Sequence, residues 1–206
     1  MRLFIAINFD STVKARIRNA AEQLREHAVR GRFVRDEHMH LTLEFLGEVE
    51  PNHIPEVCDA MDALDVEPFV MRTGDMDCFK RRDGDLWFLK IAASRFLCGT
   101  PEAGRPVDTL HYTPEAGHSA QDEPLHQLQK ALHCNLKKHG FRLENRPYRP
   151  HITIGRNVEL QTDAEGSRVT LPGPCIEIDV QSIELMQSEF EGGRLIYTPL
   201  HSKPLT

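Results

Sequence analysis

Two short segments of the chain carry the same arrangement, a histidine followed two positions later by a threonine. The first is His40 and Thr42 in "MHLTLEFLG", and the second is His151 and Thr153 in "RPHITIGR". Aliphatic residues occupy the alternate positions in both segments, which is typical of β-strands whose two faces differ in polarity. We therefore expect each histidine and its threonine on one strand face, with the aliphatic side chains in a core.

Two imidazoles and two hydroxyls facing one bound group suit phosphodiester chemistry without a metal. Displacement at phosphorus needs one group to accept a proton from the nucleophile and another to protonate the leaving oxygen. Histidine can take either role near neutral pH because its ordinary pKa is about 6.5. The threonine hydroxyls, with arginine or backbone N–H groups, would hold the non-bridging oxygens. The prediction is one catalytic site containing His40, Thr42, His151 and Thr153, with neither metal nor cofactor.

The charge of the chain restricts the kind of partner. A net charge of −6 over 206 residues argues against a protein that coats nucleic acid nonspecifically. The basic residues nevertheless gather around the two histidine segments, which favours a small anionic substrate or a nucleic-acid end. They are Arg30, Arg32 and Arg35 before the first segment and Lys137, Lys138, Arg142, Arg146, Arg149 and Arg156 around the second.

Other bulk features predict a cytoplasmic protein. No apolar run reaches the roughly 18 residues that a membrane helix needs. The apolar start "MRLFIAINFD" is short and has no cleavage site, so we interpret it as a strand rather than a signal peptide. The five cysteines are scattered and odd in number, which favours free thiols over disulfides or a zinc site.

The elements that must position the histidines follow from periodicity. We expect helices over residues 10–30, 54–64 and 124–140, where apolar residues recur at helical spacing. We expect strands over 3–9, near 33–34, over 40–45, 68–79, 85–93 and 151–154, and two or three strands over 175–200 with a hairpin at Gly192-Gly193. Residues 94–123 lack any lasting period and look like an inserted loop.

Each half of this predicted order of elements contains a helix, a segment rich in basic residues and then a His-x-Thr-x strand. The parallel suggests two related lobes facing each other, within one domain over residues 1–206. We expect this domain to be a monomer.

The sequence resembles the 2H phosphoesterase superfamily and, within it, the bacterial RNA 2′,3′-cyclic phosphodiesterase (2′-5′ RNA ligase, LigT-like) family. The segments "RLFIAI", "HLTLEFLGEV", "RPYRPHITIGR" and "YTPL" carry this resemblance in order. It implies a bilobal α+β fold with helices on the outside. Two antiparallel sheets related by a pseudo-two-fold axis would enclose a central cleft. It also implies metal-independent hydrolysis of RNA 2′,3′-cyclic phosphate ends to 2′-phosphates, and in some members reversible 2′-5′ RNA joining.

Carried over by position, the resemblance implies catalytic roles for His40, Thr42, His151 and Thr153, and phosphate binding by Arg156. We assign His40 as the acid that protonates the leaving 3′ oxygen and His151 as the base that activates water, and the reverse assignment stays open. An aromatic ring should stack on the terminal base. The candidates are Phe4, Phe9, Phe33 and Tyr148, of which we select Tyr148 and Phe9.

Three other functions fit the same residues. The substrate could be a 2′-5′ oligonucleotide, an ADP-ribose cyclic phosphate or another small cyclic ester. A metal hydrolase would use His38, His40, His151 and an acid such as Glu44, and it would be inhibited by EDTA. A binding module would hold RNA ends without turnover. A product assay separates this last function from the enzymes.

Overall fold

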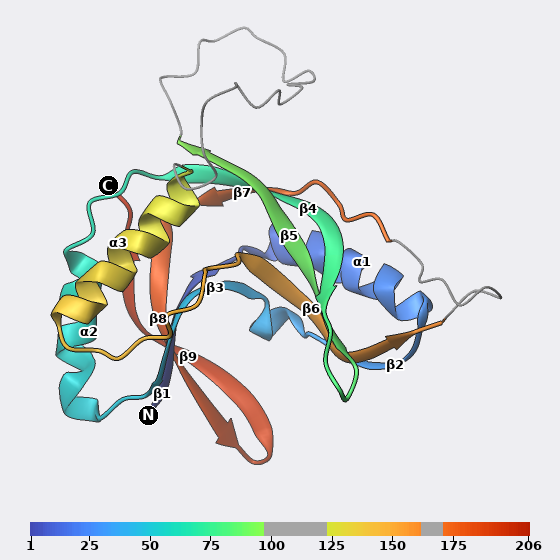
Figure 1. Ribbon diagram of the computed structural model, residues 1–206, viewed down its shortest axis with the longest axis horizontal. Coiled ribbons are helices and arrows are strands. Elements are labelled where there is room, and N and C mark those ends of the chain that lie inside the picture. The colour runs from blue at the N-terminus through green and yellow to red at the C-terminus, as the bar shows by residue number, and fades with distance from the viewer. Residues whose placement is uncertain (97–122, 162–170) are drawn as a thin grey trace, which may run out of the picture.

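The computed structural model describes residues 1–96, 123–161 and 171–206 (Figure 1). The helices and strands of these residues are α1 Ser11–Glu26, α2 Ile54–Asp62, α3 Pro124–Lys138, β1 Arg2–Asn8, β2 Ala28–Phe33, β3 His40–Glu48, β4 Phe69–Phe79, β5 Asp85–Phe96, β6 His151–Leu160, β7 Glu177–Val180, β8 Ser182–Glu191 and β9 Arg194–Pro204. Most of the insertion expected at 94–123 lies outside the described residues. None of the described helices is long and apolar enough to cross a membrane.

The predicted elements are present, with several boundaries displaced, among them the end of α1. Helix α1 begins where expected, because the Asp10 side chain accepts a hydrogen bond from the Val13 amide at 2.8 Å. It ends at Glu26 rather than near residue 30. The following residues, Ala28 to Phe33, pair with β6 and form β2 instead. Tertiary pairing thus overrides the helical continuation that the local pattern suggested.

The strands form one antiparallel sheet that curls into a half-barrel (Figure 1). Among the described residues the strand order is β7-β4-β5-β6-β3-β1-β8-β9, with β2 also paired to β6. The two sheets expected from the sequence are the two halves of this sheet. They meet where β3 pairs with β6 through Leu41 and Ile152. The α+β class is confirmed, and the seam between its halves lies within the two histidine segments.

The three helices pack against one face of the sheet. Their buried side chains, such as Ile17, Val57 and Leu132, belong to the same core cluster as Leu41 and Ile152 of the central strands. In Figure 1, α2 and α3 lie together at one end of the sheet and α1 lies at the other end. Burial of this apolar face drives the packing. The opposite face, which we call the open face, carries a separate small apolar cluster of Phe4, Ala6, Met186 and Tyr197.

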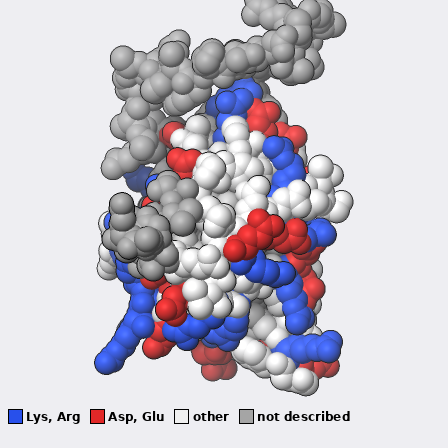
Figure 2. All heavy atoms as spheres, turned by 90° about the vertical axis from the view of Figure 1, so that its right-hand side faces the viewer, with Lys and Arg blue, Asp and Glu red and all other residues white. Residues whose placement is uncertain are grey.

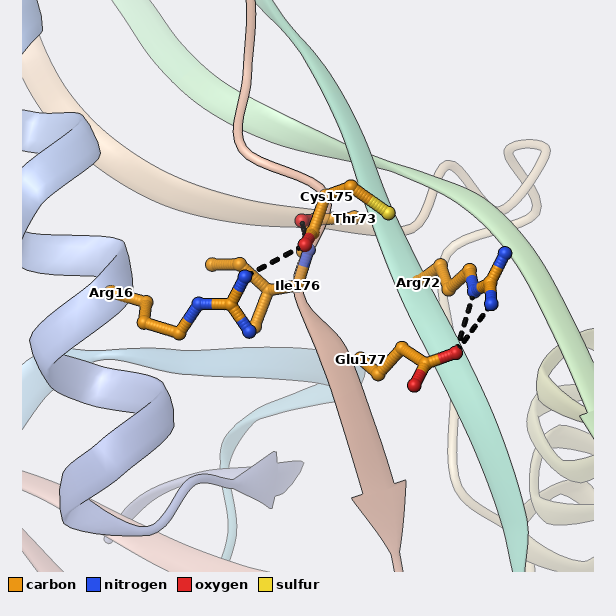
Figure 3. Close-up of polar contacts among 6 residues, drawn as sticks. All are labelled: Arg16, Arg72, Thr73, Cys175, Ile176 and Glu177. Atoms are coloured by element: carbon orange, nitrogen blue, oxygen red, sulfur yellow. Dashed lines mark hydrogen bonds and ion pairs between the residues drawn. The ribbon is translucent and has the colours of Figure 1, made fainter. Parts of the chain in front are cut away.

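Polar contacts attach the edge strand β7 to the rest of the sheet (Figure 3). The Ile176 amide donates a hydrogen bond to the Thr73 hydroxyl at 2.9 Å. Arg16 of α1 donates to the Cys175 carbonyl at 2.8 Å. These bonds satisfy backbone groups that precede β7 and connect α1 to that end of the sheet.

The turn between β8 and β9 confirms the predicted hairpin. Gly192 and Gly193 have φ values of 57° and 78°. Positive φ at both central positions is the geometry of a tight two-residue hairpin, and glycine adopts it without strain. This hairpin positions Tyr197 of β9 opposite Ser188 of β8.

Candidate active site

Each histidine segment has the two-faced burial that alternation predicts. Leu41 and Leu43 are 0% and 2% exposed, and Ile152 and Ile154 are both 0% exposed. The histidines and threonines between them are half-buried. Since side chains alternate across a strand, the polar pairs lie on the open face, away from the helices.

The pairing of β3 with β6 brings the two segments together. Leu41 lies opposite Ile152 in an antiparallel register. This register directs His40 toward the side of Thr153 and Thr42 toward the side of His151. The charge of His151 is also the smallest of the causes that lower the pKa of His40, which agrees with the proximity that this register gives the two side chains. All four predicted catalytic side chains therefore meet on one surface.

The His40 ring lies against aromatic rings of its own half of the sheet. Its centroid is 4.9 Å from that of Phe4 and 5.4 Å from that of Tyr197. Burial is the main reason that the pKa of His40 falls from its ordinary 6.5 to about 4. A hydrogen bond to the His38 backbone opposes this shift, while the positive charge of Arg156 adds to it. His40 is therefore a neutral imidazole at pH 7 in the unliganded protein.

His151 has a similar environment in the other half of the sheet. Its ring centroid is 5.3 Å from that of Phe79 and 5.2 Å from that of Phe88. Its Nδ1 lies 2.8 Å from the Arg149 carbonyl oxygen. Because a carbonyl can only accept, Nδ1 carries the proton and Nε2 is left as the proton acceptor. Burial lowers the pKa of His151 and the nearby Arg156 lowers it further, so this imidazole is also neutral at pH 7.

A bulge follows each histidine segment and changes which residues face the site. In the β1–β3 register, Thr42 pairs with Ala6 and Glu44 with Ile5, so Leu43 is passed over. In the β5–β6 register, Thr153 pairs with Phe88 and Gly155 with Trp87, so Ile154 is passed over. As a result, the fifth residue after each histidine lies on the same face of the strand as that histidine. These residues are Phe45 and Arg156.

Arg156 of β6 acts electrostatically on both halves of the site. Its charge lowers the pKa values of both His40 and His151, and it also acts on Tyr197 of β9. Arg156 is thus placed to interact with a group that both imidazoles contact, as its expected role in phosphate binding requires.

The two aromatic residues selected from the sequence occupy core positions. Phe9 is 6% exposed in the main core. Tyr148 packs against that core, and its hydroxyl donates to the Thr42 carbonyl oxygen at 3.1 Å. Burial, and then the negative charge of Glu44, raises the pKa of Tyr148. The rings around the histidines are instead Phe4, Tyr197, Phe79 and Phe88. Of these, only Phe4 was among the initial sequence candidates.

Tyr148 offers a test of its structural contact. Replacing it with phenylalanine keeps the ring and removes the hydroxyl that binds the Thr42 carbonyl. We expect the free energy of unfolding in urea to fall by about 1 kcal/mol, the usual worth of one such hydrogen bond. Unchanged stability in Tyr148→Phe would contradict this role of the hydroxyl.

The ligand set considered for a metal is divided between the two faces. Glu44 is buried on the helix side, where its carboxylate lies 2.8 Å from Nδ1 of His133 and accepts a hydrogen bond from Gln129 at 3.2 Å. It therefore points away from His40 and His151. In the described part of the chain, no three His, Cys, Asp or Glu side chains are grouped as metal ligands would be.

The fold and site define an α+β protein in which two adjacent strands present paired histidines and threonines on one open sheet face. The chain belongs to the LigT like Phosphoesterase family, whose model matches residues 7–87 and 118–197. This match confirms the family expected from the sequence.

Two relatives of known name are similar to this chain over nearly their whole length. The RNA 2′,3′-cyclic phosphodiesterase of Thermotoga maritima is 28% identical over 203 residues, covering 98% of this chain and 94% of the relative. The protein of the same name from Escherichia coli K12 is 27% identical over 206 residues, covering 100% and 97%. The crystal structure of E. coli LigT complexed with 3′-AMP superposes with a TM-score of 0.68 at 26% identity, covering 100% of this chain and 98% of that one.

Proposed function

We propose that this protein hydrolyses the 2′,3′-cyclic phosphate end of RNA to a 2′-phosphate by acid–base catalysis with its two histidines. The observation that carries the proposal is the meeting of His40, His151 and Arg156 on one open sheet face. The names of the relatives from T. maritima and E. coli support the choice of substrate.

The chemistry adds one water molecule across one P–O bond. The water oxygen bonds to phosphorus while its proton passes to a neutral imidazole. The P–O3′ bond breaks, and the 3′ oxygen receives a proton from the second histidine, which must be an imidazolium. Thr42, Thr153 and Arg156 hold the non-bridging oxygens as charge builds on them.

Two assignments of the histidines fit this scheme. The unliganded pKa of His40, about 4, favours His40 as the base, because the acid must hold a proton near neutral pH and a group with this pKa does not. The family resemblance suggested His40 as the acid. In that assignment the negative charge of the bound phosphate must raise the pKa of His40 so that it carries a proton.

The proposed activity is tested with a nucleoside 2′,3′-cyclic phosphate and with an RNA bearing that end, both in excess EDTA. We expect turnover, with the 2′-phosphate as the product, identified by phosphorus NMR or by chromatography against both isomers. A 3′-phosphate product would show that the P–O2′ bond breaks instead. Binding without any product would instead indicate a protein that holds RNA ends without turnover. Loss of activity in EDTA would favour the metal hydrolase.

A further inference from the structure

Arg156 is flanked by a second arginine on the neighbouring strand β2. Arg32 is the Cα partner of Arg156 in the β2–β6 register. Directly paired residues on antiparallel strands place their side chains on the same face. Both guanidinium groups are therefore on the side of the sheet where the histidines lie.

A third arginine approaches Arg156 from the other side. Arg81 lies in the turn between β4 and β5, where its amide donates to the Asp85 carboxylate at 3.4 Å. This turn packs tightly against β6, since a Cβ atom at Gly84 would lie 2.7 Å from the backbone carbon of Asn157. Burial is the main cause that lowers the pKa of Arg156, and the positive charges of Arg81 and Arg32 lower it further, which agrees with this arrangement.

These three arginines lack carboxylate partners for their guanidinium groups, unlike three other cations on the same elements. Arg30 of β2 pairs with Glu159 at 2.6 Å, Lys80 with Asp85 at 3.1 Å, and Lys90 with Asp77 at 3.0 Å. Arg32, Arg81 and Arg156 form no ion pair within the described part of the chain. Figure 2 shows the face at the α1 and β2 end, where basic and acidic groups lie side by side.

Three neighbouring cations without counter-charges repel one another, and an anion that binds between them relieves that repulsion. A cyclic phosphate end carries a single negative charge, which Arg156 and the two histidines suffice to hold. The positive charges of Arg32 and Arg81 remain, one on each side of β6. Each internucleotide phosphate of an RNA strand supplies one further negative charge.

We propose that Arg32 and Arg81 form a second anion site, which binds an internucleotide phosphate on the 5′ side of the cyclic end. This inference rests on the proposed function and specifies its substrate class. The preferred substrate is an oligonucleotide rather than a single nucleotide, because only an oligonucleotide occupies both sites.

The test compares two substrates of the same chemistry, a nucleoside 2′,3′-cyclic phosphate and a short RNA with that end. Arg32→Gln and Arg81→Gln should each lower kcat/KM for the RNA about fivefold more than kcat/KM for the mononucleotide, as expected for one lost phosphate contact. The rates are compared across pH, because Arg81 also lowers the pKa of His151. The matched control is Arg30→Gln, which removes the same charge from the same strand but disrupts a pair with Glu159.

A second measurement does not depend on turnover. Binding of a fluorescent RNA that ends in a 2′-phosphate is followed by anisotropy over a range of salt concentrations. Each of the two variants should reduce the slope of log K against log salt by about 0.7, the value for one contact to a single strand. Arg30→Gln should leave the slope unchanged.

Equal losses on both substrates, no loss on either, or an unchanged salt slope would overturn the second anion site. A wild-type protein that is inactive on both substrates would refute the proposed function alone. A salt slope that still falls in Arg32→Gln and Arg81→Gln would then uphold the anion site. Circular dichroism of each variant verifies that it is folded.

Discussion

Replacing either His40 or His151 with alanine should lower kcat on a nucleoside 2′,3′-cyclic phosphate by about 10²- to 10⁴-fold, the usual contribution of one proton-transfer group. The two imidazoles lie on adjacent strands, with the His40 ring against Phe4 and the His151 ring against Phe88. Each is therefore fixed on one side of the phosphate, and neither can take over the role of the other. The measurement is the initial rate of each variant under saturating substrate, with product identified as above.

The double variant extends this result. Two groups that act in one proton-transfer step are non-additive, so the double variant should be little slower than the slower single variant. The control is His53→Ala, which removes an exposed histidine at the start of α2, where it pairs with Glu56. Activity that survives the loss of either His40 or His151 would contradict the two-histidine mechanism.

The same variants distinguish the acid from the base when the leaving group is changed. A phosphodiester with a 4-nitrophenolate leaving group needs no protonation of the departing oxygen. The variant that lacks the acid should recover most of its lost rate on this substrate, while the variant that lacks the base should not. Recovery in His151→Ala would establish His40 as the base, in agreement with its low pKa in the unliganded protein.

The polar face of each histidine strand follows from sequence alone, because it depends only on alternation. His40 and Thr42 lie on one face and Leu41 and Leu43 on the other, as the pattern predicts. The start of α1 was equally predictable, since Asp10 caps it through a local contact. Both features arise within a few residues of chain.

The bulges that complete the site were not predictable from the pattern. Simple alternation places Glu44 beside Thr42, whereas the bulge at Leu43 turns Glu44 into the core, where it contacts His133 of α3. Alternation also places Arg156 on the core face, but the bulge at Ile154 returns it to the open face. A bulge depends on the register of the partner strand, which is a long-range property.

The aromatic rings around the two histidines also depend on long-range strand pairing. Tyr148 was selected from the sequence as a stacking residue, yet its hydroxyl binds the Thr42 carbonyl. The rings that contact His151 come from β4 and β5 instead. Tyr197 reaches His40 only because β9 pairs with β8, which in turn pairs with β1. Such neighbours are determined by strand order rather than by local sequence.

The low pKa of His40 also makes the stability of the folded protein depend on pH. The unfolded chain binds a proton at this histidine with a pKa of about 6.5, whereas the folded protein does so only near 4. Between these values the unfolded state binds more protons, so stability is fully present above the unfolded pKa and is lost as pH falls toward the folded pKa. The burial of His151 acts in the same direction.

We expect the contribution of His40 to fall by about 2 kcal/mol between about pH 7.5 and about pH 5, and by about 3 kcal/mol once the pH is below 4. Urea unfolding at these pH values measures the loss. Other groups titrate over the same range, so the informative quantity is the difference between wild type and His40→Asn, which retains an N–H donor for the His38 backbone and cannot titrate. This variant should lose about 2 kcal/mol less than wild type on acidification, whereas His53→Asn should lose as much as wild type. Equal acid sensitivity in wild type and His40→Asn would show that His40 is already solvated in the unliganded protein. The argument for His40 as the base would then fail, while the proposed activity would still stand on its product assay.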